Sequence, residues 1–235
     1  MKQSVHRIAL VFFLINLIAI GASIASGYHR GKLAYRFEEK QAMTYFSSNQ
    51  LAATALMAWA TYLAHRKLLK RDPWKNRSVL FWALSALGFF FLMMDESFQI
   101  HEGFDNFIAH GKGGGHTNAG FDGLATLGYG VVAIGVCYYF RAELLRYRRC
   151  LIYFAIGGIF LVLTSVLDIG DESQLQIVIE ESCKMLGVVA FLMAYVGAFF
   201  GSLEEAGAAM RSAPAEAMNE NVERAPERIR RAAQG

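Results

Sequence analysis

The chain has 235 residues, of which 54% are hydrophobic and 13% aromatic, and its mean hydropathy is positive at +0.29. This composition excludes an ordinary soluble domain, and the modest formal net charge of +3 gives no reason to expect a nucleic-acid partner. Apolar stretches of about 18 or more residues are typical of transmembrane helices, because about 20 residues at 1.5 Å each cross a hydrocarbon core of about 30 Å.

Six stretches of this kind follow one another along the chain, and their ends are uncertain by about 2 to 4 residues. The first follows Lys2, His6 and Arg7 as in a signal sequence, but its apolar run is long, so we expect a retained helix. Runs such as LIYFAIGGIFLVLTSVL do not alternate, which excludes a membrane β-barrel. The sequence therefore predicts an all-α, polytopic membrane protein with six transmembrane helices, at residues 8–26, 46–65, 79–100, 122–141, 151–170 and 177–200.

The connecting segments predict the orientation of these helices, because basic loops mark the cytoplasmic side of a membrane. The segments HRKLLKRDPWKNR (65–77) and RAELLRYRR (141–149) are strongly basic, whereas those after the third and fifth helices are neutral to acidic. The first outer segment, YHRGKLAYRFEEK (28–40), is basic and does not fit this pattern. We expect both termini in the cytoplasm of a bacterium, with the protein in its inner membrane.

Two regions are predicted from the change in composition near residue 206. Residues 1–205 form the six-helix transmembrane domain, and residues 206–235 form a polar cytoplasmic tail containing Pro214 and Pro226, expected to be flexible.

With this topology, ionisable residues from distant parts of the chain lie at one depth near the outer face. Six acids and one base in this layer give a formal sum of minus five, and carboxylates in lipid are costly, so some must take up protons or bind a cation. We expect Asp95, His101, Glu102 and Glu181 as the main ligands, with Asp168 and Glu180 supporting them, around a divalent Zn, Mn or Fe ion. His110 and His116 flank a glycine-rich loop that could fold over the site. The charged residues of the layer are Asp95, Glu96, Glu102, Asp168, Glu180, Glu181 and Lys184.

Helical spacing refines this expectation. At 100° per residue, Asp95, Gln99 and Glu102 share an arc of about 60°, while Glu96 points elsewhere. Glu180 and Lys184 are four residues apart in the order that favours an ion pair, which leaves Glu181 free. Few ionisable groups lie between this layer and the cytoplasm, and no pathway through the membrane is evident from the sequence.

The motifs DESFQIHE (95–102) and EESCKMLG (180–187) resemble those of uncharacterised bacterial multi-pass inner-membrane proteins that carry DExxxxHE on one helix and an acidic segment on a later one. Ser97 and His101 are also similar to part of a motif of the membrane hydrolases related to alkaline ceramidases. That second resemblance implies a zinc site completed by a later HxxxH helix, but no histidine follows His116 in this chain.

Three functions stay open from the sequence. The first is a cation-binding membrane protein that moves a metal ion or a proton. The second is a metal-dependent membrane hydrolase acting on a lipid or a small periplasmic substrate, with Glu96 or Glu181 as general base. The third is a non-catalytic accessory subunit of a membrane complex. Membrane lipids are the expected partners, and both a homo-oligomer and a larger complex are compatible with the sequence.

Overall fold

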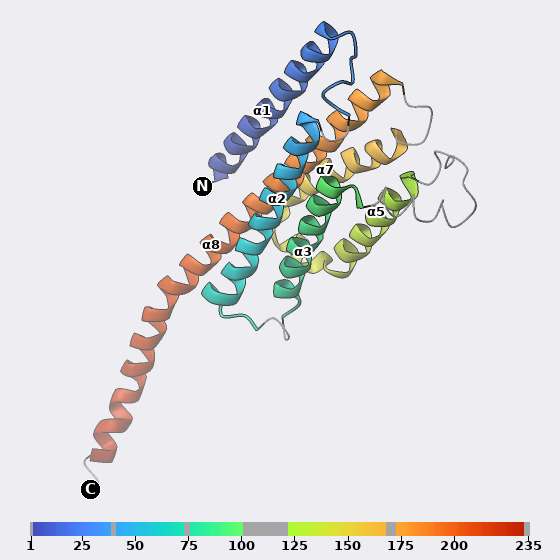
Figure 1. Cartoon of the computed structure of the whole chain (residues 1–235). Coiled ribbons are helices and arrows are strands. Elements are labelled where there is room, and N and C mark those ends of the chain that lie inside the picture. Colours follow the sequence, from blue (N-terminus) through green and yellow to red (C-terminus); the bar gives the residue numbers. More distant parts are fainter. Residues whose placement is uncertain (1, 39–40, 73–75, 101–121, 168–172, 233–235) are drawn as a thin grey trace.

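The computed structural model describes residues 2–38, 41–72, 76–100, 122–167 and 173–232, and all regular structure in these ranges is helical. This confirms the predicted all-α fold, and the first five long helices begin and end within a few residues of the expected positions. Figure 1 shows the elements in chain order. They are α1 (Lys2–His29), α2 (Ala42–Leu63), the π-helix η1 (Ala64–Leu68), α3 (Arg77–Phe98), α5 (Asp122–Tyr139), α6 (Arg141–Arg146), α7 (Arg148–Leu167) and α8 (Gln174–Ala232).

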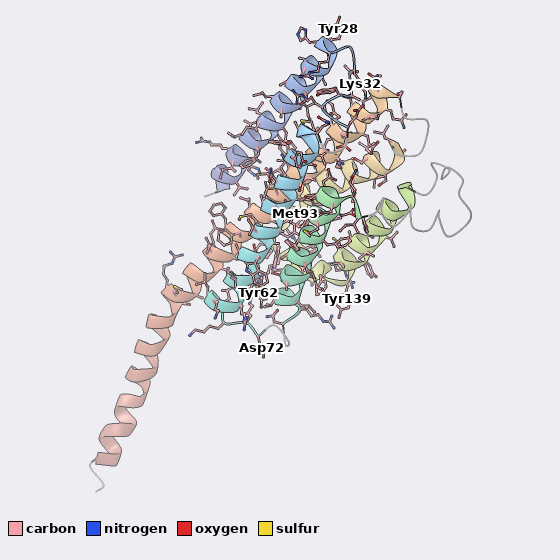
Figure 2. All side chains as sticks on the ribbon, viewed as in Figure 1. Tyr28, Lys32, Tyr62, Asp72, Met93 and Tyr139 are labelled. Atoms are coloured by element: carbon pink, nitrogen blue, oxygen red, sulfur yellow. The ribbon has the colours of Figure 1, made fainter. Side chains whose placement is uncertain are left out.

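The long helices run alternately up and down, so two sets of connections lie at opposite ends of the bundle (Figure 1). Tyr28 and Lys32 mark one end, and Asp72 and Tyr139 mark the other (Figure 2). We call these the α1–α2 end and the α2–α3 end, after the connection that each contains. Helix α8 is the centre of the bundle, since it packs against α7, α2 and α1.

Four helical segments are long and apolar enough to cross a membrane: Val5–His29, Arg77–Phe98, Cys150–Leu167 and Gln174–Ser212. Many large apolar side chains on these segments face outward, for example Ile18 and Ile159, as lipid-facing residues do. The chain is therefore a helical membrane protein. Helices α2 and α5 do not meet the same criterion, and the described apolar part of α5 is Gly128–Tyr139.

Helices α7 and α8 approach one another closely because glycines lie between them. A Cβ atom on Gly187 would lie 3.1 Å from Cβ of Phe160, and one on Gly157 would lie 3.0 Å from the ring of Phe191. Small residues of this kind let backbones come together where lipid provides no hydrophobic driving force. This contact fixes the position of α7 against the central helix.

The segment between α1 and α2 folds back over its end of the bundle. Ala34 and Phe37 are almost fully buried, and they share a core cluster with Met43 of α2 and with Val178 and Met185 of α8. The backbone N–H of Leu33 also donates a hydrogen bond of 2.7 Å to Oε1 of Gln174. This segment therefore covers the beginning of α8.

Helix α8 has 59 residues and is about 90 Å long at 1.5 Å per residue. It continues past the bundle without interruption (Figure 1). The described part of the predicted tail, to Ala232, is thus helical and continuous with the last membrane-spanning segment. Its flexibility stays a prediction.

Candidate functional site

A cluster of three charged side chains lies near the α1–α2 end of the bundle, where the last turns of α3 meet the first turns of α8. Nζ of Lys184 lies 2.6 Å from Oε1 of Glu181 and 3.1 Å from Oε1 of Glu96. Ser47 of α2 donates a hydrogen bond of 2.7 Å to the same Oε1 of Glu96. Three helices therefore meet at one carboxylate, and we call Glu96, Glu181 and Lys184 the charged trio.

The trio is only partly accessible to solvent. The side chain of Lys184 is 27% exposed, and those of Glu96 and Glu181 are each 14% exposed. Two carboxylates and one ammonium give a formal charge of minus one. The two carboxylates therefore share one ammonium.

The geometry corrects two expectations from helical spacing. Lys184 pairs with Glu181, three residues earlier, and with Glu96, so the expected pair with Glu180 and the expected freedom of Glu181 were both wrong. Spacing within one helix favoured Glu180 as the partner of Lys184, but α3 supplies a second carboxylate, that of Glu96. The side chain of Lys184 points toward Glu96 and contacts it.

The expected arc of Asp95, Gln99 and Glu102 assumed a helix through residue 102, but α3 ends at Phe98 and Glu102 lies outside the described residues. Gln99 takes a left-handed conformation (φ 54°), and its N–H donates a bond of 2.7 Å to the carbonyl of Asp95. This is a helix C-cap, a position where Gly or Asn is more usual. The regular helix therefore ends before residue 99.

The predicted metal ligands fall into two groups. Asp95 is buried at 6% exposure, and Glu180 and Glu181 lie in the first turns of α8. His101, Glu102 and Asp168 lie outside the described residues, as do His110 and His116. In the described part of the chain, no group of three or more His, Cys, Asp or Glu side chains is placed to hold a metal ion. The catalytic roles expected for Glu96 and Glu181 stay predictions.

A stripe of buried polar side chains runs along α2 away from the trio. Ser47, Gln50, Thr54 and Thr61 lie within an arc of about 60° on this helix, and each is at most 7% exposed. Nε2 of Gln50 donates to Oδ1 of Asn16 on α1 at 2.8 Å. The Oε1 atom of Gln50 is buried without a hydrogen-bond partner among the described residues, so it can accept from an additional donor such as water. We call these four residues the α2 stripe.

A second polar cluster lies at the α2–α3 end, centred on His65 of η1. The imidazole is fully buried, and Trp82 of α3 packs beside it. Nε2 of His65 lies 2.9 Å from the hydroxyl of Tyr147 and 3.0 Å from Oγ of Ser202, and Nδ1 lies 3.0 Å from Oγ of Ser78. His65 thus connects η1 to α3, to the α6–α7 junction and to α8.

Four charged side chains surround this histidine and balance one another. Arg71 bonds to Glu205 at 2.5 Å, and Arg146 also bonds to Glu205. Glu143, buried at 8% exposure, accepts a bond of 3.0 Å from Nε1 of Trp82. Two arginines and two glutamates give a formal charge of zero. We call this set, together with His65, Tyr147, Ser78, Trp82 and Ser202, the His65 network.

The hydrogen bonds identify the protonation state of His65. Nη1 of Arg71 lies 3.0 Å from Nδ1, and a guanidinium only donates, so Nδ1 accepts and the proton is on Nε2. Burial, followed by the charges of Arg71 and Arg146, lowers the pKa of His65 to about 3. Burial also raises the pKa of Tyr147 to about 12. Both groups are therefore neutral at ordinary pH.

Sequence reasoning missed the His65 network and the α2 stripe. The residues of α2 recur at intervals of three, four and seven, which is the period of one helix face, and this was the available signal for the stripe. Most residues of the network lie in the two segments predicted as basic loops, namely His65, Arg71, Glu143 and Arg146. Their partner Glu205 lies 59 residues after Arg146. Nothing local in the sequence connects them.

These features define a helical membrane protein with two polar clusters and a buried polar stripe between them. Residues 6–199 match the family described as a domain of unknown function, DUF8692. The match covers most of the chain, and the protein belongs to this family. No curated protein and no solved structure matches the chain.

Proposed function

We propose that the protein is a six-helix integral membrane protein whose charged trio binds and releases one proton, and that the α2 stripe carries this proton toward the His65 network. The observation that carries the proposal is the position of Lys184, between Glu96 and Glu181 and next to the first residue of the stripe. An internal ammonium already occupies the place that a metal ion would take between these two carboxylates.

Six spans require α2 and α5 to cross the membrane in addition to the four segments described above. The polar residues of α2 lower its mean hydropathy, but they are buried inside the bundle, where polar groups are tolerated in membrane proteins. Helix α5 has 18 residues, which is close to the minimum for a span.

The orientation is supported by the distribution of basic residues. The α2–α3 end carries Arg66, Lys67, Arg71 and Arg77 together with Arg146, and such an end lies in the cytoplasm by the positive-inside rule. The trio then faces the periplasm of a bacterial inner membrane, and the α8 extension enters the cytoplasm.

The position of Lys184 between the two carboxylates favours a single proton over a metal ion as the ligand of the trio. Binding one proton to either carboxylate brings the formal charge from minus one to zero, whereas a divalent ion in the same place would have to displace Lys184. Metal binding through His101, Glu102 and Asp168 stays a prediction, and so does the hydrolase alternative.

One position on the face of the α2 stripe carries no polar side chain, and this position suggests which residue to mutate. Ala58 is fully buried and lies on the same face between Thr54 and Thr61, so the two hydroxyl-bearing residues are about 10 Å apart along the helix axis. Proton transfer over this distance requires water between them. Replacing Thr54 by valine removes a hydroxyl with little change in shape.

The proposal is tested by proton flux into proteoliposomes that contain the purified protein. We expect Thr54→Val and Lys184→Met each to reduce the flux by about tenfold, equivalent to about 1.4 kcal/mol in the rate-limiting barrier. Lys32→Met is the matched control, because Lys32 pairs with Glu38 at 2.5 Å in a more exposed position. Equal flux in all four proteins, or no flux above that of empty liposomes, would contradict the proposal.

A further inference from the structure

A cavity of about 740 Å³ lies beside the His65 network, between the beginning of α1, the α6–α7 junction and α8, and Arg146, Tyr147 and Glu205 of that network form part of its wall. Apolar side chains, including Val5, Leu145 and Phe200, form part of its wall. Polar and charged side chains form the rest: His6, Arg146, Arg148, Tyr153, Glu204 and Glu205. The cavity is thus amphipathic and is within the size range of small-molecule sites.

The charged part of the wall carries both signs. Arg146 is bonded to Glu205, which also binds Arg71, so these groups are occupied within the His65 network. Arg148 and Glu204 are both exposed and complete the charged lining. His6 adds a ring nitrogen, Nδ1, that lies 2.7 Å from the hydroxyl of Tyr153. One cationic and one anionic side chain are therefore presented to the cavity outside the network.

The cavity is also at the depth of a membrane interface. Arg148 lies two residues before the apolar segment Cys150–Leu167, and Val5 begins the segment Val5–His29. Leu145 is 52% exposed, so the cavity wall continues onto an apolar outer surface. Basic pockets between helices on the cytoplasmic side of membrane proteins are known binding sites for lipid headgroups.

We infer that this cavity binds a phospholipid with a phosphoethanolamine headgroup. Arg148 and His6 bind the phosphate, Glu204 binds the primary ammonium, and the acyl chains follow the apolar wall beside Val5 and Leu145. A lining with both signs favours this zwitterionic headgroup over a purely anionic one. The inference concerns a different site from the charged trio, so it does not depend on proton binding there.

The test measures lipid binding to the purified full-length protein by native mass spectrometry. Phosphatidylethanolamine is compared with phosphatidylglycerol, which lacks the ammonium, and with phosphatidylcholine, whose quaternary ammonium cannot donate hydrogen bonds. We expect the wild type to bind phosphatidylethanolamine about tenfold more tightly than either, which corresponds to one good charged contact.

Two variants separate the contributions of the headgroup contacts. Glu204→Gln should abolish the preference for phosphatidylethanolamine over phosphatidylglycerol, and Arg148→Gln should weaken the binding of all three lipids. Arg211→Gln is the control and should bind the lipids as the wild type does. Arg211 is an exposed arginine of α8, the helix that carries Glu204, and it is not part of the cavity lining. Thermal unfolding checks that each variant is folded. We expect both variants to fold, because the side chains of Arg148 and Glu204 are exposed. Equal binding of the three lipids by the wild type, tighter binding of phosphatidylglycerol, unchanged selectivity in Glu204→Gln, or unchanged affinity in Arg148→Gln would overturn the inference.

Discussion

The two ends of the bundle both contain charged side chains, but they are balanced differently. At the α2–α3 end, Arg71 and Arg146 offset Glu143 and Glu205, and the central His65 is neutral. At the α1–α2 end, Lys184 faces two carboxylates, and these three side chains carry a formal charge of minus one. The first set has equal numbers of cations and anions, whereas in the second set two carboxylates share one ammonium.

The residues at the centre of the His65 network are also less exposed to solvent than those of the charged trio. His65 and Trp82 are fully buried, while the side chains of the charged trio are 14% to 27% exposed. The centre of the His65 network is thus sealed within the packing of η1, α3, α6 and α8, whereas its outer charged side chains, Arg71, Glu205 and Arg146, are 17%, 30% and 39% exposed. A buried neutral imidazole in this position favours a structural role for the centre of the network, and the proton exchange proposed for the trio concerns the other end.

The largest expected effect is at the trio. Lys184→Met leaves two partly buried carboxylates facing one another without their counter-ion. We expect a loss of about 3 kcal/mol in the free energy of unfolding near neutral pH, measured by chemical unfolding in detergent. The double variant Glu96→Gln/Lys184→Met should recover part of this loss, because only one charge then remains.

Lys32→Met removes a lysine from an exposed ion pair and should cost less than about 1 kcal/mol. If Lys184→Met were no more harmful than this control, the trio would not be an energetically coupled cluster.

A smaller loss is expected at the His65 network. His65→Leu keeps the site filled but leaves the hydrogen-bonding groups of Arg71, Ser78 and Tyr147 without their partner. Each unsatisfied buried group costs about 1 to 3 kcal/mol, and partial rearrangement should bring the total to about 2 kcal/mol. The same chemical unfolding measures it, with the exposed His29→Leu as control. Identical stability of the two variants would argue against a structural role for His65.

The smallest effect is the dependence of stability on pH. The pKa of His65 in the folded protein, about 3, is below the ordinary value of 6.5, so the unfolded chain takes up a proton first as the pH falls. The contribution of neutral His65 is therefore complete above about pH 6.5 and is lost as the pH falls toward 3.

Between about pH 6.5 and about pH 5 this corresponds to about 1.5 kcal/mol. Unfolding free energies measured across this interval should fall in the wild type and fall less in His65→Gln. Parallel pH profiles for the two proteins would show that the imidazole is not held neutral.

The fold was largely predictable, because every helix that crosses a membrane must be long and apolar, and both properties are visible in the sequence. The all-α architecture and the helix positions followed from hydropathy alone. Glu96 and Glu181, both named from the sequence, each contact Lys184 in the structure, and their predicted roles as general base and metal ligand stay predictions. Their pairing was not predictable, because the carboxylate that draws Lys184 toward α3 is 88 residues away along the chain, from 96 to 184.

The His65 network was beyond sequence reasoning for a related reason. The sequence placed Arg71 and Arg146 in basic loops. Basic residues in such loops indicate which side of the membrane a loop lies on, but they do not identify the side chains that they contact. Their partner Glu205 lies close to the expected boundary between the transmembrane domain and the tail. Only the continuation of α8 as a single helix brings Glu205 to the two arginines.

Infrared spectroscopy of the carboxyl groups tests the central claim most directly. As the pH is lowered from about 9 to about 5, a range above the ordinary carboxyl values of about 4, the proposal expects the wild type to gain one protonated-carboxyl signal that disappears in Glu96→Gln or Glu181→Gln. Lys184→Met should gain a further signal at the same site, because its two carboxylates lack the ammonium. A spectrum in which neither glutamate changes protonation over this range, with or without Lys184, would contradict the account.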